Sequence, residues 1–164
     1  MKRIKKLTRK FMNDLADSIY RKSEGKACYM HLCARTLTNG PDPKDPKRKM
    51  HCGLGELYFA MTGKHADLDN DNVDEDGVID LAVMLAGFDK PKRLAAAAIR
   101  KAGLEVDLQN DLLDRLNRQS TAAEDDFRDV LDSIPTINDR SDTYPKRAKR
   151  VAAKLRDAAK LLPP

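Results

Sequence analysis

The sequence predicts a mostly α-helical fold: a compact single domain over residues 1–164, with about six to seven helices. Helical periodicity at both ends, and glycines at the ends of apolar segments between them, favour this fold class. With 41% hydrophobic and 35% charged residues, the chain can build a core, and no apolar run is long enough to cross a membrane. The exception to helix is a short extended segment and loop expected near residues 26–49.

The two ends of the chain carry the clearest helical patterns. Apolar residues recur at three- and four-residue steps from Ile4 to Ile19, which predicts a helix over residues 4–22. Near the other end, Pro145 suits a first helical turn, and an apolar stripe runs from Ala148 to Leu162. The sequence therefore predicts a second amphipathic helix that ends before the final two prolines.

Shorter helices are predicted in the middle of the chain. Three of them precede a glycine that would end the helix, and two more show weaker periodicity. These predicted helices are Gly53–Met61, Val78–Ala86, Lys92–Lys101, Leu108–Asn117 and Ala122–Leu131.

The region from Lys26 to Lys49 does not follow the helical pattern. Alternating apolar residues between Cys28 and Leu32 indicate a short extended segment, and Asn39 to Pro43 contains several turn residues. We expect residues 42–49 to form a polar surface loop, with a binding element as the alternative.

Charge is distributed unevenly along the chain, which has a net charge of +5 and a pI near 9.1. Both ends are basic, whereas residues 67–80 are acidic. If the two terminal helices lie side by side, their basic residues merge into one partner-binding surface. The candidate partner-binding residues are Lys5, Lys6, Arg9, Lys146, Arg147 and Arg150.

Cysteine and histidine residues cluster in the first third of the chain. Zinc prefers four nitrogen or sulfur ligands, and Cys28, His31, Cys33 and Cys52 supply these atom types. Their spacing is not that of a familiar zinc ribbon or knuckle, so buried reduced thiols are favoured over a metal site.

Cys52 lies directly before a predicted helix, where backbone N–H groups can stabilise a thiolate. A cysteine-dependent hydrolase also needs a base, and the adjacent His51 is poorly placed to serve. The favoured interpretation is that Gly53 and Gly55 permit close helix packing while Cys52 fills the space beneath.

The stretch from Asn72 to Asp80 resembles an EF-hand calcium loop, whose first eight positions it fits. Position twelve would be Val83, which cannot supply the bidentate carboxylate. We therefore favour an acidic helix start over a calcium site.

Two short motifs carry a resemblance to a known group of proteins. His51 to Leu57, together with Ile137-Asn138-Asp139 before the last helix, resembles an uncharacterised family of small bacterial and phage proteins with a C-x-x-G-A-L and a W-N-D motif. Glu56 and Ile137 depart from that pattern. The resemblance implies that Cys52, Gly55, Asn138 and Asp139 lie close together, and it supplies no activity. Read from the residues alone, Asn138 and Asp139 form a turn and cap before the last helix.

Common enzyme and cofactor motifs are missing from the sequence, so we expect no cofactor. No secretory signal precedes the first helix, which predicts a cytoplasmic protein without a membrane partner. The favoured function is a small accessory or inhibitor-type protein that binds a macromolecular protein partner, and the phage association comes from the resemblance alone. One alternative is nucleic-acid binding through the basic terminal helices. A second is a cysteine hydrolase that uses Cys52, Asn138 and Asp139.

Overall fold

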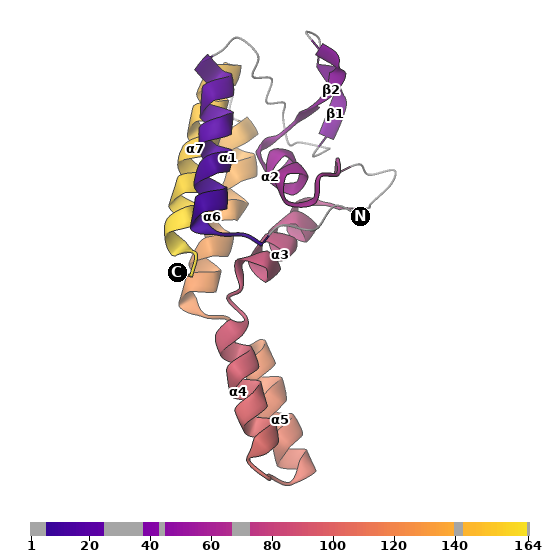
Figure 1. Cartoon of the computed structure of the whole chain (residues 1–164), viewed down its shortest axis with the longest axis vertical. Coiled ribbons are helices and arrows are strands. Elements are labelled where there is room, and N and C mark those ends of the chain that lie inside the picture. Colours follow the sequence, from indigo (N-terminus) through magenta and orange to yellow (C-terminus); the bar gives the residue numbers. More distant parts are fainter. Residues whose placement is uncertain (1–5, 25–37, 43–44, 67–72, 140–142, 164) are drawn as a thin grey trace.

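The computed structural model describes residues 6–24, 38–42, 45–66, 73–139 and 143–163 (Figure 1). The predicted mostly α-helical fold is confirmed. The elements in these ranges are α1 (Arg9–Glu24), β1 (Thr38–Asp42), β2 (Asp45–His51), α2 (Gly53–Thr62), α3 (Glu75–Ala86), α4 (Lys90–Lys101), α5 (Val106–Arg118), α6 (Ala122–Asp139) and α7 (Tyr144–Leu161).

Helices α1, α6 and α7 form the main bundle of the body, and α1 runs antiparallel to α7 (Figure 1). Arg9 at the start of α1 donates from Nε to the carbonyl of Leu162, at 2.8 Å. Further along the pair, Arg156 and Asp17 form an ion pair of 2.7 Å. The apolar stripes predicted for the two terminal helices face the core. Their fully buried residues include Met12, Ala16, Ile19, Ala148, Val151, Ala152 and Leu155.

Helix α2 packs against this bundle at its first residue, Gly53. A β-carbon on Gly53 would lie 2.7 Å from Cγ2 of Ile134 in α6 and 3.0 Å from Cγ1 of Val151 in α7. Only a residue without a side chain allows this approach. The expectation that Gly53 permits close packing above a buried Cys52 is confirmed, because Cys52 is 0% exposed.

Helix α1 begins later than the predicted residue 4. The structure shows residues 6–8 outside the helix, where the amide of Leu7 donates to the carbonyl of Leu85. Thr8 then caps the helix by accepting from the amide of Phe11 at 3.1 Å. The helix starts at Arg9 because a threonine cap satisfies a free amide of the first turn.

Helix α6 extends beyond the predicted end at Leu131 and continues through Pro135 to Asp139. A proline inside a helix removes one backbone hydrogen bond and costs about 3 kcal/mol. Burial of Leu131, Ile134 and Asn138 on either side of Pro135 offsets that cost. The interpretation of Asn138 and Asp139 as a turn is therefore wrong, because both belong to the last turn of α6.

The segment predicted as a loop over residues 42–49 lies largely in an antiparallel hairpin. Thr38 pairs with His51 and Pro41 pairs with Lys49, with register shifts between the pairs. Prolines are tolerated here because both strands of a two-stranded sheet are edges. The predicted extended segment around Cys28 lies outside the described residues.

The remaining helices match their predicted positions to within about three residues. Asp74 caps α3 by accepting from the amide of Gly77 at 2.8 Å. Pro91 falls in the first turn of α4, and Pro145 in the first turn of α7. Gly63 and Gly87 adopt the left-handed conformation that ends α2 and α3, as their positions predicted.

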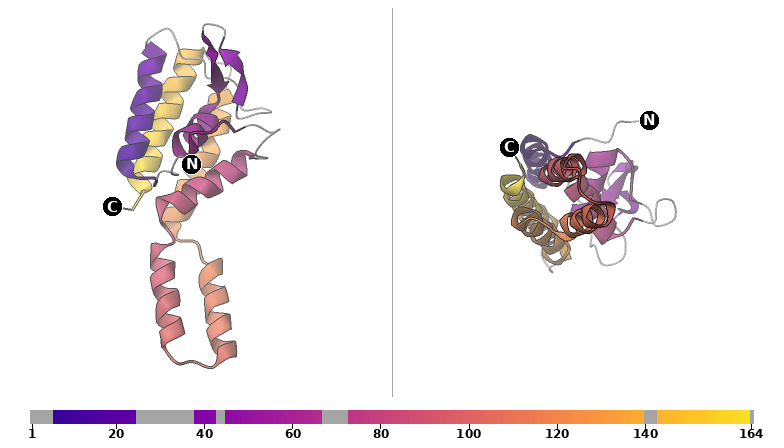
Figure 2. Two further views of the ribbon diagram at one scale, coloured as in Figure 1. Left: turned by 45° about the vertical axis from the view of Figure 1, so that its right-hand side comes forward. Right: turned by 90° about the horizontal axis from the view of Figure 1, so that it is seen from below.

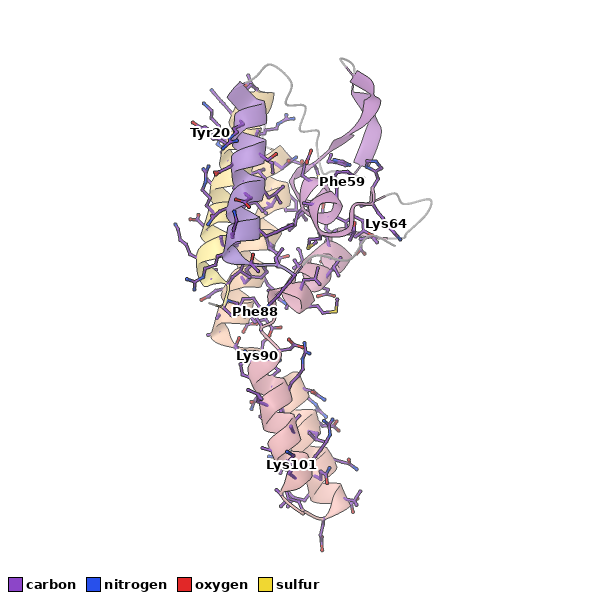
Figure 3. The ribbon with its side chains drawn as sticks, in the orientation of Figure 1. Tyr20, Phe59, Lys64, Phe88, Lys90 and Lys101 are labelled. Atoms are coloured by element: carbon purple, nitrogen blue, oxygen red, sulfur yellow. The ribbon has the colours of Figure 1, made fainter. Side chains whose placement is uncertain are left out.

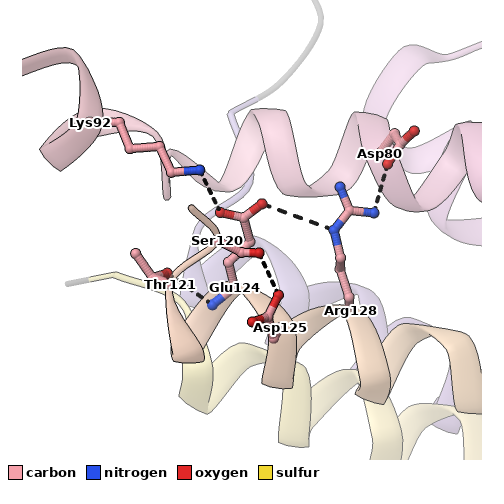
Figure 4. Close-up of polar contacts among 7 residues, drawn as sticks. All are labelled: Asp80, Lys92, Ser120, Thr121, Glu124, Asp125 and Arg128. Carbon is pink, nitrogen blue, oxygen red and sulfur yellow. Dashed lines mark hydrogen bonds and ion pairs between the residues drawn. The ribbon is translucent and has the colours of Figure 1, made fainter. Parts of the chain in front are cut away.

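Helices α4 and α5 form a hairpin that projects away from the body, here called the arm (Figure 2). No residue of either helix is buried. At its base, Glu124 of α6 contacts Lys92 of the arm at 3.7 Å and Arg128 at 4.0 Å, while Arg128 also pairs with Asp80 of α3 (Figure 4). This network and the contact between the rings of Phe88 and Phe127 attach the arm to the body.

We expect Gly53→Ala to lower the free energy of unfolding by about 1–3 kcal/mol, because the new methyl group would overlap Ile134 and Val151. Urea unfolding followed by circular dichroism measures the change. Gly77→Ala is the matched control in the first turn of α3, where the nearest atom is a carboxylate oxygen at 3.2 Å. A Gly53 variant as stable as the Gly77 variant would contradict the packing described for α2.

Candidate functional site

Cys52, Gly53 and Asn138 meet where α2 begins and α6 ends. The amide of Gly53 donates to Oδ1 of Asn138 at 3.0 Å, and Nδ2 of Asn138 donates to Asp139. Sγ of Cys52 accepts from the amide of Gly55 at 3.4 Å. The proximity of Cys52, Gly55, Asn138 and Asp139 that the resemblance implied is therefore observed, while the family relationship stays a prediction.

This junction has the features of a helix cap. Cys52 and Asn138 are both 0% exposed, and each accepts a hydrogen bond from a free amide in the first turn of α2. Such caps stabilise a helix start that is buried away from water. The geometry favours a structural role over catalysis, because a nucleophilic sulfur needs access to its substrate.

The side chain of His51, the residue before Cys52, interacts with His65 and Glu56. Nε2 of His51 lies 2.8 Å from Nδ1 of His65, and Nδ1 of His51 lies 3.5 Å from Oε1 of Glu56. The ring of Phe59 stacks on both imidazoles. These contacts fasten the end of β2 to α2.

Of the four candidate metal ligands, which the sequence disfavours as a zinc site, only Cys52 lies within the described residues. Within the ranges that the structure covers, no three His, Cys, Asp or Glu side chains lie where they could hold a metal ion. Cys28, His31 and Cys33 lie outside those ranges, and Cys52 is a buried cap. In the calcium-like stretch, Asp74 caps a helix that already contains Glu75 to Gly77, which supports the interpretation as an acidic helix start.

Several carboxylates meet where α3 begins and α6 ends. Burial raises the pKa of Glu75, and the negative charges of Asp139, Asp76, Asp74 and Asp132 raise it further. Burial also raises the pKa of Asp132, with a further contribution from Asp76. The negative charges nearby therefore oppose ionisation of Glu75 and Asp132.

The predicted merging of the basic termini into one surface is wrong. Because α1 and α7 are antiparallel, Lys6 and Arg9 lie at the opposite end of the bundle from Lys146 and Arg147. Lys149 lies over the ring of Tyr20, near the end of α1, which fixes the same orientation. Arg150 belongs to the end that holds Lys146, and Lys5 lies outside the described residues.

Among the residues that the structure describes, three of the five large apolar side chains that are exposed lie on the arm. Leu94 is 66% exposed, Val106 is 71% exposed and Leu108 is 50% exposed. Ala95, Ile99, Leu112 and Leu116 are only partly covered. Each helix thus has a distinct apolar face that the other helix alone does not bury.

A groove of about 1030 Å³ lies at the base of the arm, between the starts of α1 and α4 and the end of α7. Its apolar part includes the buried side chains of Leu7, Phe88 and Leu162. The described side chains that line it also include five basic residues and one acidic residue, Asp89. The basic residues are Lys6, Arg9, Lys10, Lys90 and Arg93.

Sequence reasoning identified only part of this surface. Lys6 and Arg9 were predicted to contact a partner, but their neighbours Lys90 and Arg93 come from a distant part of the chain. The run of alanines flanked by basic residues in α4 was a usable signal, since it gives a strongly amphipathic helix with little apolar volume for a core.

A comparison with family models, curated proteins and solved structures found no match to this chain. None of the helices that the structure describes is long and apolar enough to cross a membrane.

We expect Asn138→Ala to lower the free energy of unfolding by about 1–3 kcal/mol, because it leaves the buried amide of Gly53 without its acceptor. Asn117→Ala, at an exposed position of α5, is the control and should change stability by less than about 0.5 kcal/mol. Thermal and urea unfolding measure both. Unchanged stability in Asn138→Ala would contradict the capping role of Asn138.

Proposed function

We propose that the protein is a small accessory or inhibitor-type protein that binds a macromolecular protein partner through the α4–α5 arm. The single observation that carries the proposal is the arm itself, a helical hairpin without a buried residue that exposes Leu94, Val106 and Leu108. In Figure 3, the labels Lys90 and Lys101 mark the two ends of α4, and the side chains of the arm project from the hairpin. An exposed apolar surface of this kind is typical of a protein interaction site.

The short lengths of α4 and α5 support this proposal. Helices of 12 and 13 residues are marginally stable in water on their own and need their apolar faces covered. A partner that supplies apolar side chains would cover the faces of α4 and α5 together, as in a helical bundle.

The alternatives have less support. Nucleic-acid binding through both basic ends would need one continuous positive surface, and the antiparallel packing of α1 and α7 separates them. A hydrolase centred on Cys52 would need an accessible sulfur, and Cys52 is 0% exposed.

Affinity capture from a nuclease-treated lysate, followed by purification of the captured protein and titration, tests the proposal. We expect Leu94→Gln to weaken binding about tenfold, since a buried leucine contributes about 1.5–3 kcal/mol. Met84→Gln is the matched control, because Met84 is an apolar side chain, 57% exposed, on α3 in the body. Capture that disappears on nuclease treatment would instead favour the nucleic-acid alternative, and equal binding by the Leu94 variant would exclude the arm as the contact.

A further inference from the structure

The groove at the base of the arm combines an apolar floor with a positive rim. Leu7, Phe88 and Leu162 lie within the lining, and each is at most 5% exposed. Arg9 and Arg93 have partners in the chain, the carbonyl of Leu162 and the carboxylate of Asp89. A ligand that fits this groove carries negative charge beside an apolar group.

The groove continues onto the exposed face of α4. Lys90, Arg93 and Leu94 are spaced by three and four residues, so they share one side of the helix. Lys90 and Arg93 line the groove, and Leu94 is 66% exposed. The groove and the apolar face of the arm therefore form one surface.

The tip of the arm, where α4 ends and α5 begins, carries acidic and apolar side chains, which are the two kinds of group that the groove would bind. Glu105 precedes the first turn of α5, which contains Val106 and Asp107. Val106 and Leu108 are the exposed apolar side chains at this end, at 71% and 50%. The start of α5 thus presents acidic and apolar groups side by side, while α4 ends in Arg100 and Lys101 at the same tip.

We propose that the partner of the arm is a second copy of this chain, with the tip of each arm in the groove at the base of the other. The inference rests on the proposed function and names its partner. A two-fold axis across the arms makes both contacts identical, as in most homodimers.

Charge selects this tip-to-base orientation over the alternative. The base carries Lys90, Arg93, Arg115 and Arg118 from the arm, of which Arg93 pairs with Asp89 and Arg115 with Asp111. Lys90 and Arg93 line the groove together with the basic side chains from the start of α1. Pairing base with base would bring two such positive regions together, whereas pairing tip with base brings to each groove a tip on which Glu105 and Asp107 balance the charges of Arg100 and Lys101.

The size of the contact predicts a weak dimer. Helix α4 has 12 residues and is about 18 Å long, so two adjacent helices offer a face of only about 400 Å². Even with both tips seated, the interface lies near the lower limit for stable complexes, and small interfaces of this kind are typical of weak association, so we expect a dissociation constant in the micromolar range.

Sedimentation of the full chain from about 5 to 500 µM tests the proposal, and we expect a reversible monomer–dimer equilibrium. Lys90→Glu and Asp107→Lys should each weaken dimerisation at least tenfold. An equimolar mixture of the two variants should restore it, because in the mixed dimer one contact joins the two substituted positions with their charges exchanged and the second contact is unchanged. Lys146→Glu, at the far end of the bundle, is the control with the same change in net charge as Lys90→Glu and should dimerise normally.

Circular dichroism checks that each variant is folded, and Glu105→Lys replaces Asp107→Lys if the latter disrupts α5. A chain that stays monomeric at every concentration would overturn the inference, as would a dimer that neither variant weakens or that the mixture fails to restore. A monomer that still captures another protein through Leu94 would leave the proposed function intact, so the two failures are distinguishable.

Discussion

An amphipathic helix is stable in a protein only where its apolar face is covered, and this requirement divides the molecule into two parts. In the body, α1, α6 and α7 bury their stripes against one another and against α2. The approach of α2 depends on Gly53, and Asn138 satisfies the amide that this approach removes from water. In the arm, the same requirement is unmet, because neither α4 nor α5 buries a residue.

The sequence predicts the helices well because their signals are local. Apolar periodicity in α1 and α7, and the glycines after α2 and α3, depend only on neighbouring residues. The extension of α6 through Pro135 could not be predicted, since it depends on burial of Ile134 and Asn138 against distant elements. The hairpin was missed because Pro41 and its neighbours are typical of turns, and pairing between strands is not visible in either segment alone.

At the candidate site, too, the sequence identified individual residues but not their neighbours in space. Cys52 and Asn138 were singled out from short motifs, and the structure places both at one buried helix cap, where their polar atoms accept backbone hydrogen bonds. Lys6 and Arg9 are predicted to contact a partner together with Lys146, but the groove that Lys6 and Arg9 line also contains Lys90 and Arg93 and does not contain Lys146. The sequence alone could not show which basic residues lie near one another, because the antiparallel packing of the terminal helices is a tertiary property.

Backbone hydrogen exchange in dilute solution tests the central claim, which is that the arm has no core of its own. Amides in α6 and α7 should exchange only through global unfolding, whereas amides in α4 and α5 should exchange at least about 100-fold faster through local opening. Equal protection of the arm and the body at low protein concentration would contradict the account, because it would mean that the faces of α4 and α5 are already covered within a single chain.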